Sequence, residues 1–374
     1  MSTGTRPSMR APDSVECVAL PEYAIRIARG LLDAVGSITR EVAPAHRYAL
    51  LTDDVVDALY AERVLASFDG AAVLRLRISA GEQHKTRERW AELTDAMLTA
   101  GLGRDTTVIA LGGGVVGDLA GFVAATYMRG VPFVQVPTTL LAMIDASIGG
   151  KTGVDTPHGK NLVGAFHQPA AVIVDPSVLS TLPPPYRRAG AAEAIKHGVI
   201  ADPAYLAQLE RSLPQALDDT TSDAMRELVV GSIAIKASVV REDVHERGRR
   251  KILNFGHTLG HAIEAASSYG IPHGEAVAIG MVLEARLAER IGVARVGMAD
   301  RVEHVVRSAG LGTAIPAGIA RDRIVALTHG DKKTRAGSVE YALPIEVGRM
   351  AGADRGWTVP VSDDDVGAAL TTGA

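Results

Sequence analysis

The first half of the chain alternates short β-rich apolar runs with helical patterns, and this alternation limits its fold more than any other feature. The apolar runs span residues 47–51, 73–78, 107–111, 133–136 and 172–174. Helical patterns such as residues 85–100 lie between them. Strands separated by helices predict βαβ units and a mostly parallel sheet.

The pattern changes at the proline cluster Pro183-Pro184-Pro185. Helical periodicity then dominates in residues 187–199, 202–212, 222–241, 251–267, 274–291 and 298–309, and a short β-like piece follows at 339–343. We therefore expect two domains: an α/β domain in residues 1–183 and a mainly α-helical domain in residues 184–374. The polar ends, residues 1–15 and 363–374, are expected to be disordered and frayed respectively.

Composition narrows the class of protein. Of the 374 residues, 47% are hydrophobic and 22% charged, which is typical of a globular chain. A net charge of −4 and only 4% aromatic residues argue against a nucleic-acid partner. The single cysteine, Cys17, rules out an intramolecular disulfide and a cysteine-based zinc site. No apolar run is long enough to span a membrane, so a cytoplasmic location is expected.

A histidine-rich segment is the clearest candidate for chemistry. His257 and His261 would lie one turn apart on the same face of a helix, and His273 opens the next helical run. Three imidazoles this close can converge on one divalent metal. The alternative is that they are ordinary core or surface histidines, because most short motif matches are coincidental. The spacing is not His-Glu-x-x-His, which removes the main support for a zinc protease.

A glycine-rich loop follows the run at 107–111. Gly112, Gly114 and Gly117 fit the pattern G-x-G-x-x-G, which lets backbone N–H groups hold a pyrophosphate at a helix N-terminus. The acidic residue that normally ends the next strand is missing from residues 133–139. We favour nucleotide binding by an arrangement other than the ordinary Rossmann pattern. The alternative is a tight strand–helix turn.

Residues 145–169 form a second segment rich in glycine and lysine. It does not satisfy the P-loop pattern, but Lys151 and Lys160 suit anionic oxygens. Surrounding glycine and hydroxyl residues favour a loop that faces a ligand, against the alternative of two solvated lysines.

Further charges are scattered along the second half. Individually they read as ordinary ion pairs or solvated charges: Glu193, Lys196, Lys236, Arg250 and Asp331-Lys332-Lys333. Together they would form a cationic pocket beside a divalent metal. Such a pocket suits a phosphorylated, carboxylated substrate.

From about residue 47 to 348 the chain resembles the 3-dehydroquinate synthases of the sugar phosphate cyclase superfamily. The resemblance rests on motifs in the family's order: residues 112–122, Arg129-Gly130, 135–141, 149–152, 159–166, 192–196, 254–258, 273–277 and Asp331-Lys332-Lys333. It implies a Rossmann-like NAD domain, a helical metal-binding domain, an active site between them, and a homodimer.

The resemblance also implies a reaction. The family converts 3-deoxy-D-arabino-heptulosonate 7-phosphate to 3-dehydroquinate and phosphate in the shikimate pathway of aromatic amino acid biosynthesis. The steps are transient oxidation by NAD, phosphate elimination, reduction and an intramolecular aldol closure.

Site residues carry over position by position. The metal, zinc or cobalt, is implied on Glu193, His257 and His273, while His261 resembles the family's proton-handling histidine. The implied NAD contacts are Glu82, Lys85, Gly113, Gly114, Val115, Asp118, Thr138, Thr139, Asp145, Lys151, Lys160, Thr181 and Leu182. The implied substrate and catalytic residues are Arg129, Lys151, Asn161, Lys196, Lys236, Arg250, Asn254, Lys332 and Lys333.

Two positions depart from the family pattern. Pro185-Tyr186 stands where Arg-Glu is usual, which puts one contact at the cofactor end of the cleft in doubt. Asp155-Thr156 replaces the more frequent Asn-His.

Rival functions remain at this point. The nearest is an aminodehydroquinate synthase or another sugar phosphate cyclase of secondary metabolism. Cyclases of sedoheptulose 7-phosphate or glucose 6-phosphate are disfavoured as alternatives. Their substrates lack the carboxylate that Arg250, Asn254 and the lysines of this chain are expected to bind. A metal- and NAD-dependent polyol dehydrogenase would differ by producing net NADH. A binding protein without turnover would need a defect in the pocket residues, and none is evident.

Overall fold

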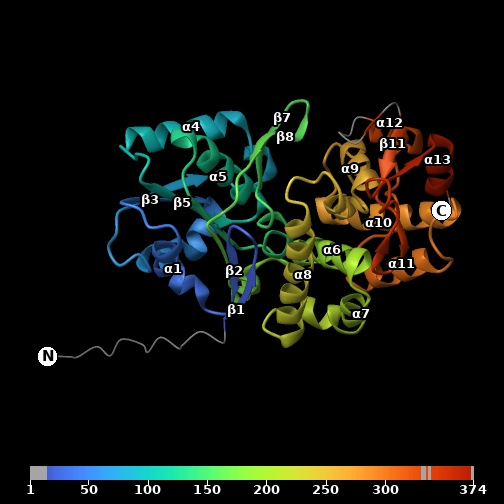
Figure 1. Ribbon diagram of the computed structural model, residues 1–374, viewed down its shortest axis with the longest axis horizontal. Helices are drawn as coiled ribbons and strands as arrows, with labels where there is room; N and C mark the ends of the chain where they lie inside the picture. Colours follow the sequence, from blue (N-terminus) through green and yellow to red (C-terminus); the bar gives the residue numbers. More distant parts are fainter. Residues whose placement is uncertain (1–14, 330–333, 336–337, 372–374) are drawn as a thin grey trace.

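The computed structural model describes residues 15–329, 334–335 and 338–371 (Figure 1). Most of the expected N-terminal leader, together with Asp331, Lys332 and Lys333, lies outside these residues. A sheet with helices on both faces forms one half, and packed helices form the other half. Within the described residues, no helix combines the length and the apolar character needed to cross a membrane.

The sheet has seven strands in the order β1-β2-β9-β6-β5-β3-β4. The strands are β1 (Glu16–Ala19), β2 (Ala24–Ile27), β3 (Arg47–Asp53), β4 (Val73–Ile78), β5 (Thr106–Gly112), β6 (Phe133–Pro137) and β9 (Ala171–Val174). All neighbouring pairs are parallel except β1 with β2. The five predicted strands are confirmed, and the short edge pair β1–β2 was not predicted.

The strand order determines where a ligand can bind. Counted from β3, the five strands β4-β3-β5-β6-β9 have the doubly wound order 2-1-3-4-5. The chain reverses direction across the sheet between β3 and β5. In such sheets the ligand crevice lies beyond the carboxyl ends of the strands at this switch point. The glycine loop starts there, since β5 ends at Gly112.

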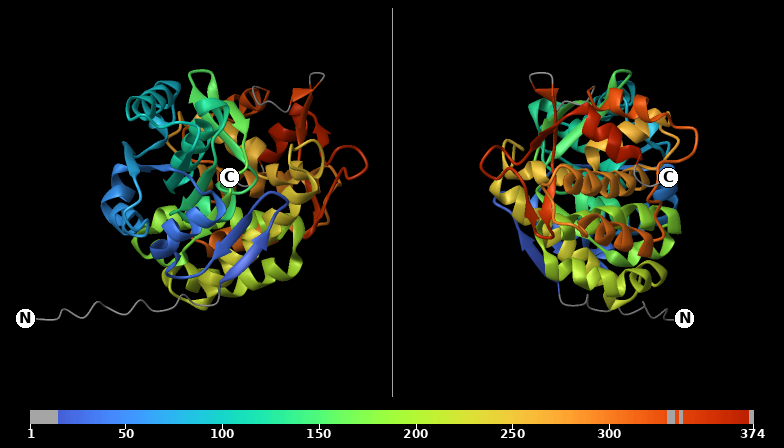
Figure 2. Two further views of the ribbon diagram at one scale, coloured as in Figure 1. Left: turned by 60° about the vertical axis from the view of Figure 1, so that its left-hand side comes forward. Right: turned by 90° about the vertical axis from the view of Figure 1, so that its right-hand side faces the viewer.

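Helices cover both faces of the sheet (Figures 1 and 2). They are α1 (Val35–Val42), α2 (Asp54–Val56), α3 (Glu62–Ala66), α4 (Arg87–Thr99) and α5 (Gly114–Thr126). Successive residues of β3 point to opposite faces, as strand geometry requires. Leu50 joins the apolar cluster that contains α1, and Ala49 and Leu51 join the one that contains α4 and α5.

A β-hairpin replaces the ligand-facing loop predicted for residues 145–169. Strands β7 (Lys151–Thr156) and β8 (Gly159–Phe166) pair antiparallel, with Gly153 opposite Gly164. A β-carbon on Gly153 would lie 2.7 Å from the Val163 carbonyl oxygen, so glycine permits the close approach of the strands. Gly153 and Gly164 therefore serve strand pairing, and the hairpin projects between the two halves of the molecule (Figure 1).

The second half contains the remaining helices. They are α6 (Pro184–Ala201), α7 (Pro203–Asp218), α8 (Asp223–Glu242), α9 (His257–Ala266), α10 (His273–Arg290), α11 (Met298–Ser308), α12 (Arg321–Thr328) and α13 (Asp363–Thr371). Short strands accompany them: β10 (Thr334–Arg335), β11 (Ser338–Tyr341), β12 (Pro344–Glu346), β13 (Arg349–Met350) and β14 (Val359–Val361). The most extensive apolar cluster contains residues of both halves, among them Val174 of β9 and Ile195 of α6.

Two expectations for this half were wrong. The helix predicted over residues 251–267 is broken, because Gly256 has φ +79° and separates a 3-10 helix, Arg249–Asn254, from α9. The tail predicted to fray is helical over Asp363–Thr371. Its Val366, Ala369 and Leu370 are buried against the apolar cluster around α9 and α10, which keeps it in place.

Candidate active site

The glycine loop forms the first part of the site. Gly113 is the N-cap of α5 and has no side chain to occupy the helix N-terminus. The end of β6 lies alongside, because the Thr138 N–H donates to the Gly112 carbonyl at 2.9 Å. A β-carbon on Gly113 would lie 3.1 Å from Thr139 Cγ2. Open backbone N–H groups at a helix N-terminus fit the pyrophosphate of a dinucleotide.

A buried lysine organises the charges beside this loop. Lys85 is 3% exposed, and its Nζ lies 2.8 Å from Glu82, 3.4 Å from Asp118 and 3.7 Å from Asp155. Burial raises the pKa of Asp118 to about 6, although Lys85 opposes the rise. The three acids raise the pKa of Lys85 against the effect of its burial. Three carboxylates around one ammonium leave acceptors for hydroxyl groups of a ligand.

The carboxylate Glu193 faces two histidine rings across the helical half. Glu193 is fully buried on α6, and its Oε1 has no hydrogen-bond partner. His257 Nε2 lies 3.5 Å from this oxygen and His273 Nε2 lies 3.9 Å from it. A buried carboxylate oxygen facing two imidazole nitrogens matches the donors that a zinc-type ion prefers. The residues therefore fit the predicted metal.

The other ring nitrogen of each histidine is occupied. His257 Nδ1 lies 3.2 Å from the Phe255 carbonyl oxygen, and His273 Nδ1 lies 3.2 Å from Glu264 Oε2. Both acceptors favour a proton on Nδ1, so Nε2 is the nitrogen that is turned toward Glu193. Glu284 of α10 fixes the start of α9, because its carboxylate accepts from the N–H groups of Gly256 and Leu259.

Two other groupings compete with this ligand set. His261 lies close to both histidines, with ring centroids 5.3 Å from His257 and 5.7 Å from His273, but it is exposed. Asp145, Glu193 and His197 also converge. The grouping of Asp145, Glu193 and His197 does not suit a metal cation. The ammonium groups of Lys196 and Lys236 already neutralise Asp145.

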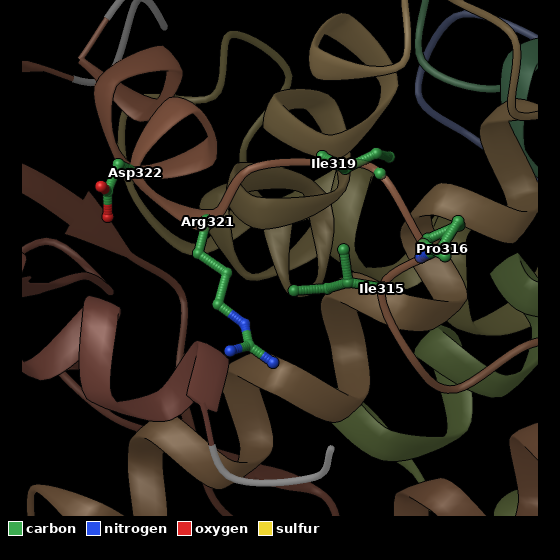
Figure 3. Close-up of a pocket in the computed structure, with 7 residues that line it drawn as sticks. Ile315, Pro316, Ile319, Arg321 and Asp322 are labelled. Atoms are coloured by element: carbon green, nitrogen blue, oxygen red, sulfur yellow. The ribbon is translucent and has the colours of Figure 1, made fainter.

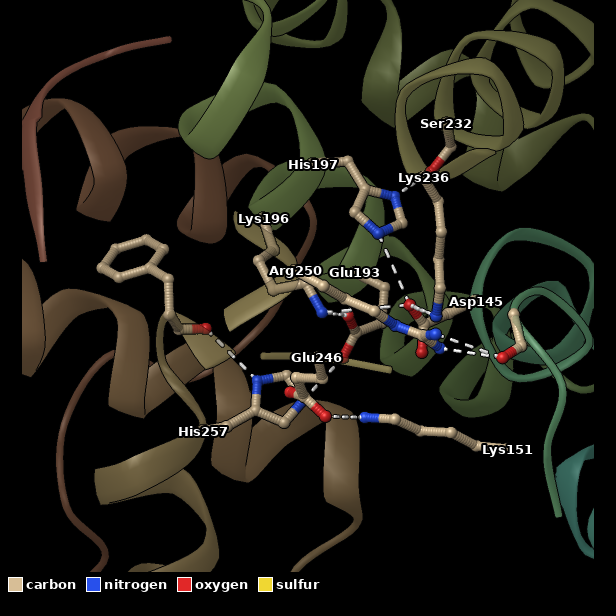
Figure 4. A network of polar contacts seen from close by, with 12 residues as sticks. Asp145, Lys151, Glu193, Lys196, His197, Ser232, Lys236, Glu246, Arg250 and His257 are labelled. Atoms are coloured by element: carbon tan, nitrogen blue, oxygen red, sulfur yellow. Dashed lines mark hydrogen bonds and ion pairs between the residues drawn. The ribbon is translucent and has the colours of Figure 1, made fainter. Parts of the chain in front are cut away.

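Three nitrogen-bearing side chains, those of Lys236, Lys196 and His197, surround Asp145 (Figure 4). Lys236 donates to Asp145, whose Oδ1 lies 3.9 Å from Lys196 Nζ and 3.4 Å from His197 Nε2. Although burial opposes ionisation, Lys236 and then Lys196 hold the pKa of Asp145 well below its usual range. Burial lowers the pKa of Lys236 to about 8. Arg250, 1% exposed, donates to the Gly149 carbonyl from both terminal nitrogens at 3.1 and 3.2 Å.

Lys151 approaches this group from the hairpin. Its ammonium forms an ion pair with Glu246, which also accepts from Asn254 Nδ2 at 2.8 Å. Burial lowers the pKa of Lys151, and Glu246 opposes this shift. Figure 4 shows Lys151, Glu246 and His257 next to the Glu193–Lys196 pair. The candidate metal-binding side chains, the cationic side chains and the Glu246 carboxylate therefore lie in one region of the structure.

Comparisons with known proteins agree with this geometry. The family models for the N-terminal and C-terminal parts of 3-dehydroquinate synthase match residues 75–189 and 190–334. A 3-dehydroquinate synthase of Desulforamulus reducens is 46% identical over 332 residues, covering 88% of this chain and 92% of that protein. That of Caulobacter vibrioides is 44% identical over 335 residues, with 87% and 90% coverage.

The chain belongs to the 3-dehydroquinate synthase family.

Solved structures of other cyclases share the fold of this family member. A 2-deoxy-scyllo-inosose synthase with carbaglucose-6-phosphate, NAD+ and Co2+ has a TM-score of 0.86 at 27% identity and covers 96% of this chain and all of that one. A 2-epi-5-epi-valiolone synthase from Streptomyces hygroscopicus with NAD+ and Zn2+ has a TM-score of 0.83 at 29% identity, with 96% and 98% coverage. A butanol dehydrogenase of Thermotoga maritima, 16% identical, shares only the fold at a TM-score of 0.68.

The structure places further predicted site residues of this synthase-family chain as follows. Arg129 is exposed, and Thr181 hydrogen-bonds to Tyr60 at 2.6 Å beside Leu182. Asn161 is exposed on β8, and its backbone N–H donates to Asp155. Lys332 and Lys333 lie outside the described residues. The unusual Pro185-Tyr186 falls in the first turn of α6, where proline fits, and Tyr186 is exposed.

Three residues of the synthase site were missed from the sequence: His197, Glu246 and Glu264. His197 follows Glu193 by four residues and Glu264 follows His261 by three, so helical spacing could have placed each next to a predicted site residue. Glu246 precedes a 3-10 helix in a loop with φ +57°, and no periodic signal marks it.

A separate surface hollow lies beside the loop before α12. It is lined by residues 315–319, 321 and 322, including Ile315, Pro316, Ile319, Arg321 and Asp322 (Figure 3). None of its lining residues belongs to the predicted set, and it contains no cluster of titratable groups. We assign it no part in the synthase site.

Proposed function

We propose that this protein is a 3-dehydroquinate synthase, an NAD- and metal-dependent lyase that converts 3-deoxy-D-arabino-heptulosonate 7-phosphate to 3-dehydroquinate and phosphate. One observation carries the proposal: the partnerless Glu193 oxygen faces the Nε2 atoms of His257 and His273 beside a group of buried cations. The relatives that cover nearly the whole chain at 44–46% identity support this substrate over those of the cyclases at 27–29%.

The proposed division of labour follows from charge and position. Glu193, His257 and His273 hold the divalent metal, zinc or cobalt. Lys196, Lys236 and Arg250, with Lys151 and Asn254 at the hairpin side, bind the phosphate and carboxylate of the substrate. Fixed cations at this spacing orient the reacting carbon atoms and exclude water, which supplies much of the rate enhancement.

The cofactor site is proposed at the switch point of the sheet. Its residues are Glu82, Lys85, Gly113, Gly114, Val115, Asp118, Thr138, Thr139, Asp145, Lys160, Thr181 and Leu182. When bound, NAD supplies a reversible hydride acceptor and the metal supplies Lewis-acid polarisation of a hydroxyl group. His261, exposed next to His257 and His273, is placed to exchange a proton with solvent during ring closure.

Phosphate release tests the proposal directly. The purified protein is given 3-deoxy-D-arabino-heptulosonate 7-phosphate, NAD+ and Co2+ or Zn2+, while free phosphate and the NADH absorbance are followed together. We expect EDTA-sensitive phosphate release without net NADH. No release would contradict the assignment and direct the assay to the amino analogue and other sugar phosphates. Steady NADH accumulation would indicate a dehydrogenase.

A matched pair of histidine variants controls for general damage. His257→Ala should abolish release, because it removes a proposed metal ligand. His304→Ala, which changes an exposed histidine on α11, should retain wild-type activity.

Assembly, location and domain limits complete the proposal. We infer a homodimer in the cytoplasm and a domain boundary at residues 183 and 184. The family resemblance supports the dimer, and the start of α6 at Pro184 supports the boundary. Light scattering on the purified protein tests the dimer, and fractionation of the source cells tests the location.

A further inference from the structure

Glu264 connects two parts of the site that belong to different elements. It lies on α9, is 3% exposed, and its two oxygens have different partners. Oε2 lies 3.2 Å from His273 Nδ1 on α10, and Oε1 accepts from Lys160 Nζ on β8 at 2.5 Å. One buried carboxylate therefore joins a proposed metal ligand to the β7–β8 hairpin.

Lys160 is held at this place from a second side. Its ammonium lies 4.8 Å from the centre of the Tyr269 ring, in the turn between α9 and α10. A cation over an aromatic face is attracted by the ring quadrupole. The residue after Lys160 ties this strand to the charges of the proposed cofactor site, because the Asn161 N–H donates to Asp155 at 2.9 Å and Asp155 lies 3.7 Å from Lys85 Nζ. Lys160 thus stands between the cofactor charges and Glu264.

Each contact has a definite chemical effect. As an acceptor for Nδ1–H, Glu264 fixes the ring orientation and tautomer of His273, so that Nε2 faces Glu193. A carboxylate in this role also makes the opposite nitrogen more basic and strengthens its bond to a metal. The ammonium of Lys160 withdraws negative charge from the same carboxylate. Any ligand that draws Lys160 away increases the charge available to His273.

We propose that Glu264 is a positioning residue that couples cofactor binding to metal binding. Its carboxylate orients His273 and shares its charge with Lys160. An anionic dinucleotide that engages Lys160 releases this charge toward the metal ligand, so cofactor and metal strengthen each other's binding. The inference rests on the proposed metal and cofactor sites, and it concerns affinities, so it can fail while the proposed reaction stands.

The test measures binding without substrate. Co2+ affinity is determined by competition with a chelator, with and without saturating NAD+, and the visible absorption of bound Co2+ is recorded. In the wild type we expect NAD+ to tighten Co2+ binding by at least about fivefold. Equal Co2+ affinity with and without NAD+ in the wild type would overturn the coupling.

Glu264→Gln separates the positioning role from general folding. The amide keeps the shape but offers one acceptor oxygen in place of two, so it cannot serve His273 and Lys160 together. We expect Co2+ affinity to fall about 10- to 100-fold, the Co2+ spectrum to change, and the effect of NAD+ to shrink toward none. Wild-type Co2+ affinity in this variant would refute the role of Glu264.

Two further variants keep the result interpretable. Glu210→Gln removes a carboxylate that bridges α7 to Arg301 of α11, at 2.7 and 3.2 Å, and should leave Co2+ affinity and coupling unchanged. Lys160→Met should bind Co2+ at least as tightly as the wild type without NAD+, because the whole charge of Glu264 then acts on His273. A tenfold loss of Co2+ affinity in Lys160→Met would contradict the proposed sharing of charge.

Discussion

The α-carbon of Gly149 lies directly against the guanidinium of Arg250. The Gly149 carbonyl accepts from both terminal nitrogens of Arg250, and a β-carbon on Gly149 would overlap this group. Gly149 also has φ +100°, a backbone conformation that side chains rarely adopt. The position of Arg250, a buried cation that we propose binds substrate, therefore depends on a residue without a side chain.

Gly149→Ala should damage substrate binding more than folding. The new methyl group displaces Arg250, and a displacement of about 1 Å in a positioning group can cost about 100-fold in rate. Steady-state kinetics should show a large loss in kcat/KM. Gly30→Ala introduces comparable backbone strain at φ +84° with no atom within 4 Å, and its kinetics should match the wild type. Equal kinetic losses in both variants would show that strain alone matters.

Metal affinity should distinguish two possible ligand sets for the metal. One combines Glu193 with His257 and His273, and the other combines His261 with the same two histidines. Glu193→Gln and His273→Ala should each weaken Co2+ binding by at least about 100-fold. Loss of a residue that only hydrogen-bonds to a metal ligand already costs about 10- to 100-fold in metal affinity, and loss of a ligand should cost more. His261→Ala should bind Co2+ within about threefold of the wild type, because its ring is exposed and outside the proposed ligand set. Strong loss of Co2+ in His261→Ala with little loss in Glu193→Gln would establish the three-histidine group instead.

The pKa of Lys236, lowered to about 8 by burial, predicts a pH limit on substrate binding. Above about pH 8 the amine loses its charge and its attraction for substrate anions, so kcat/KM should fall with an apparent pKa near 8. Lys236→Arg should move this limb to higher pH, because guanidinium stays charged. Lys251→Arg, on the neighbouring 3-10 helix, should leave it in place.

The same shift has a consequence for stability. Between about pH 8 and the ordinary lysine value of 10.5, the unfolded chain binds the Lys236 proton and the folded chain does not. The contribution of Lys236 to the free energy of unfolding should therefore rise with pH in this window. Urea titrations of the wild type and Lys236→Met across the window measure it, and parallel curves would show that no shift exists.

Helices α9 and α10, which carry the two histidines proposed to bind the metal, are in contact through glycine. A β-carbon on Gly280 would overlap the Gly256 carbonyl and lie 2.7 Å from the Gly260 nitrogen. Gly280→Ala should lower the free energy of unfolding by about 1–3 kcal/mol through overpacking. Gly367→Ala on α13 meets no atom within 4 Å and should raise it by about 0.4–1 kcal/mol. Urea unfolding measures both, and a stable Gly280→Ala would show that the helices can separate at little cost.

The parts of the fold that follow a clean period were predictable. The β-rich runs that became β3, β5, β6 and β9 are largely buried on both faces, so their sequences are mostly apolar and easily found. The run that became β4 alternates instead, because Arg75 and Arg77 are exposed while Leu76 and Ile78 are buried. The hairpin β7–β8 escaped prediction because its glycines serve strand pairing and its exposed side chains break the apolar pattern. The tail α13 was missed because three buried residues on one face, supported from outside the segment, determine its structure.

The candidate site also contains residues that could be predicted from the sequence and residues that could not. Glu193, Lys196, His257 and His273 lie in motifs that the family resemblance could transfer, and the structure brings them together. The resemblance did not point to Glu264 or His197. His197 bonds to Ser232, 35 residues away, and the partners of Glu264 lie on two other elements, α10 and β8. Lys160 was predicted as a cofactor contact, but its ion pair with Glu264, 104 residues away, depends on how the hairpin meets α9. Such pairings follow from tertiary structure and not from local pattern.

The apolar cluster that contains both Val174 of the sheet and Ile195 of α6 limits how the gene can recombine during evolution. The two family models meet between residues 189 and 190, inside α6. A gene broken at this junction would encode two products, each with one side of the cluster open to water. Recombination there can therefore succeed only when both partners have complementary surfaces, and the two halves of this chain must evolve as one inherited unit.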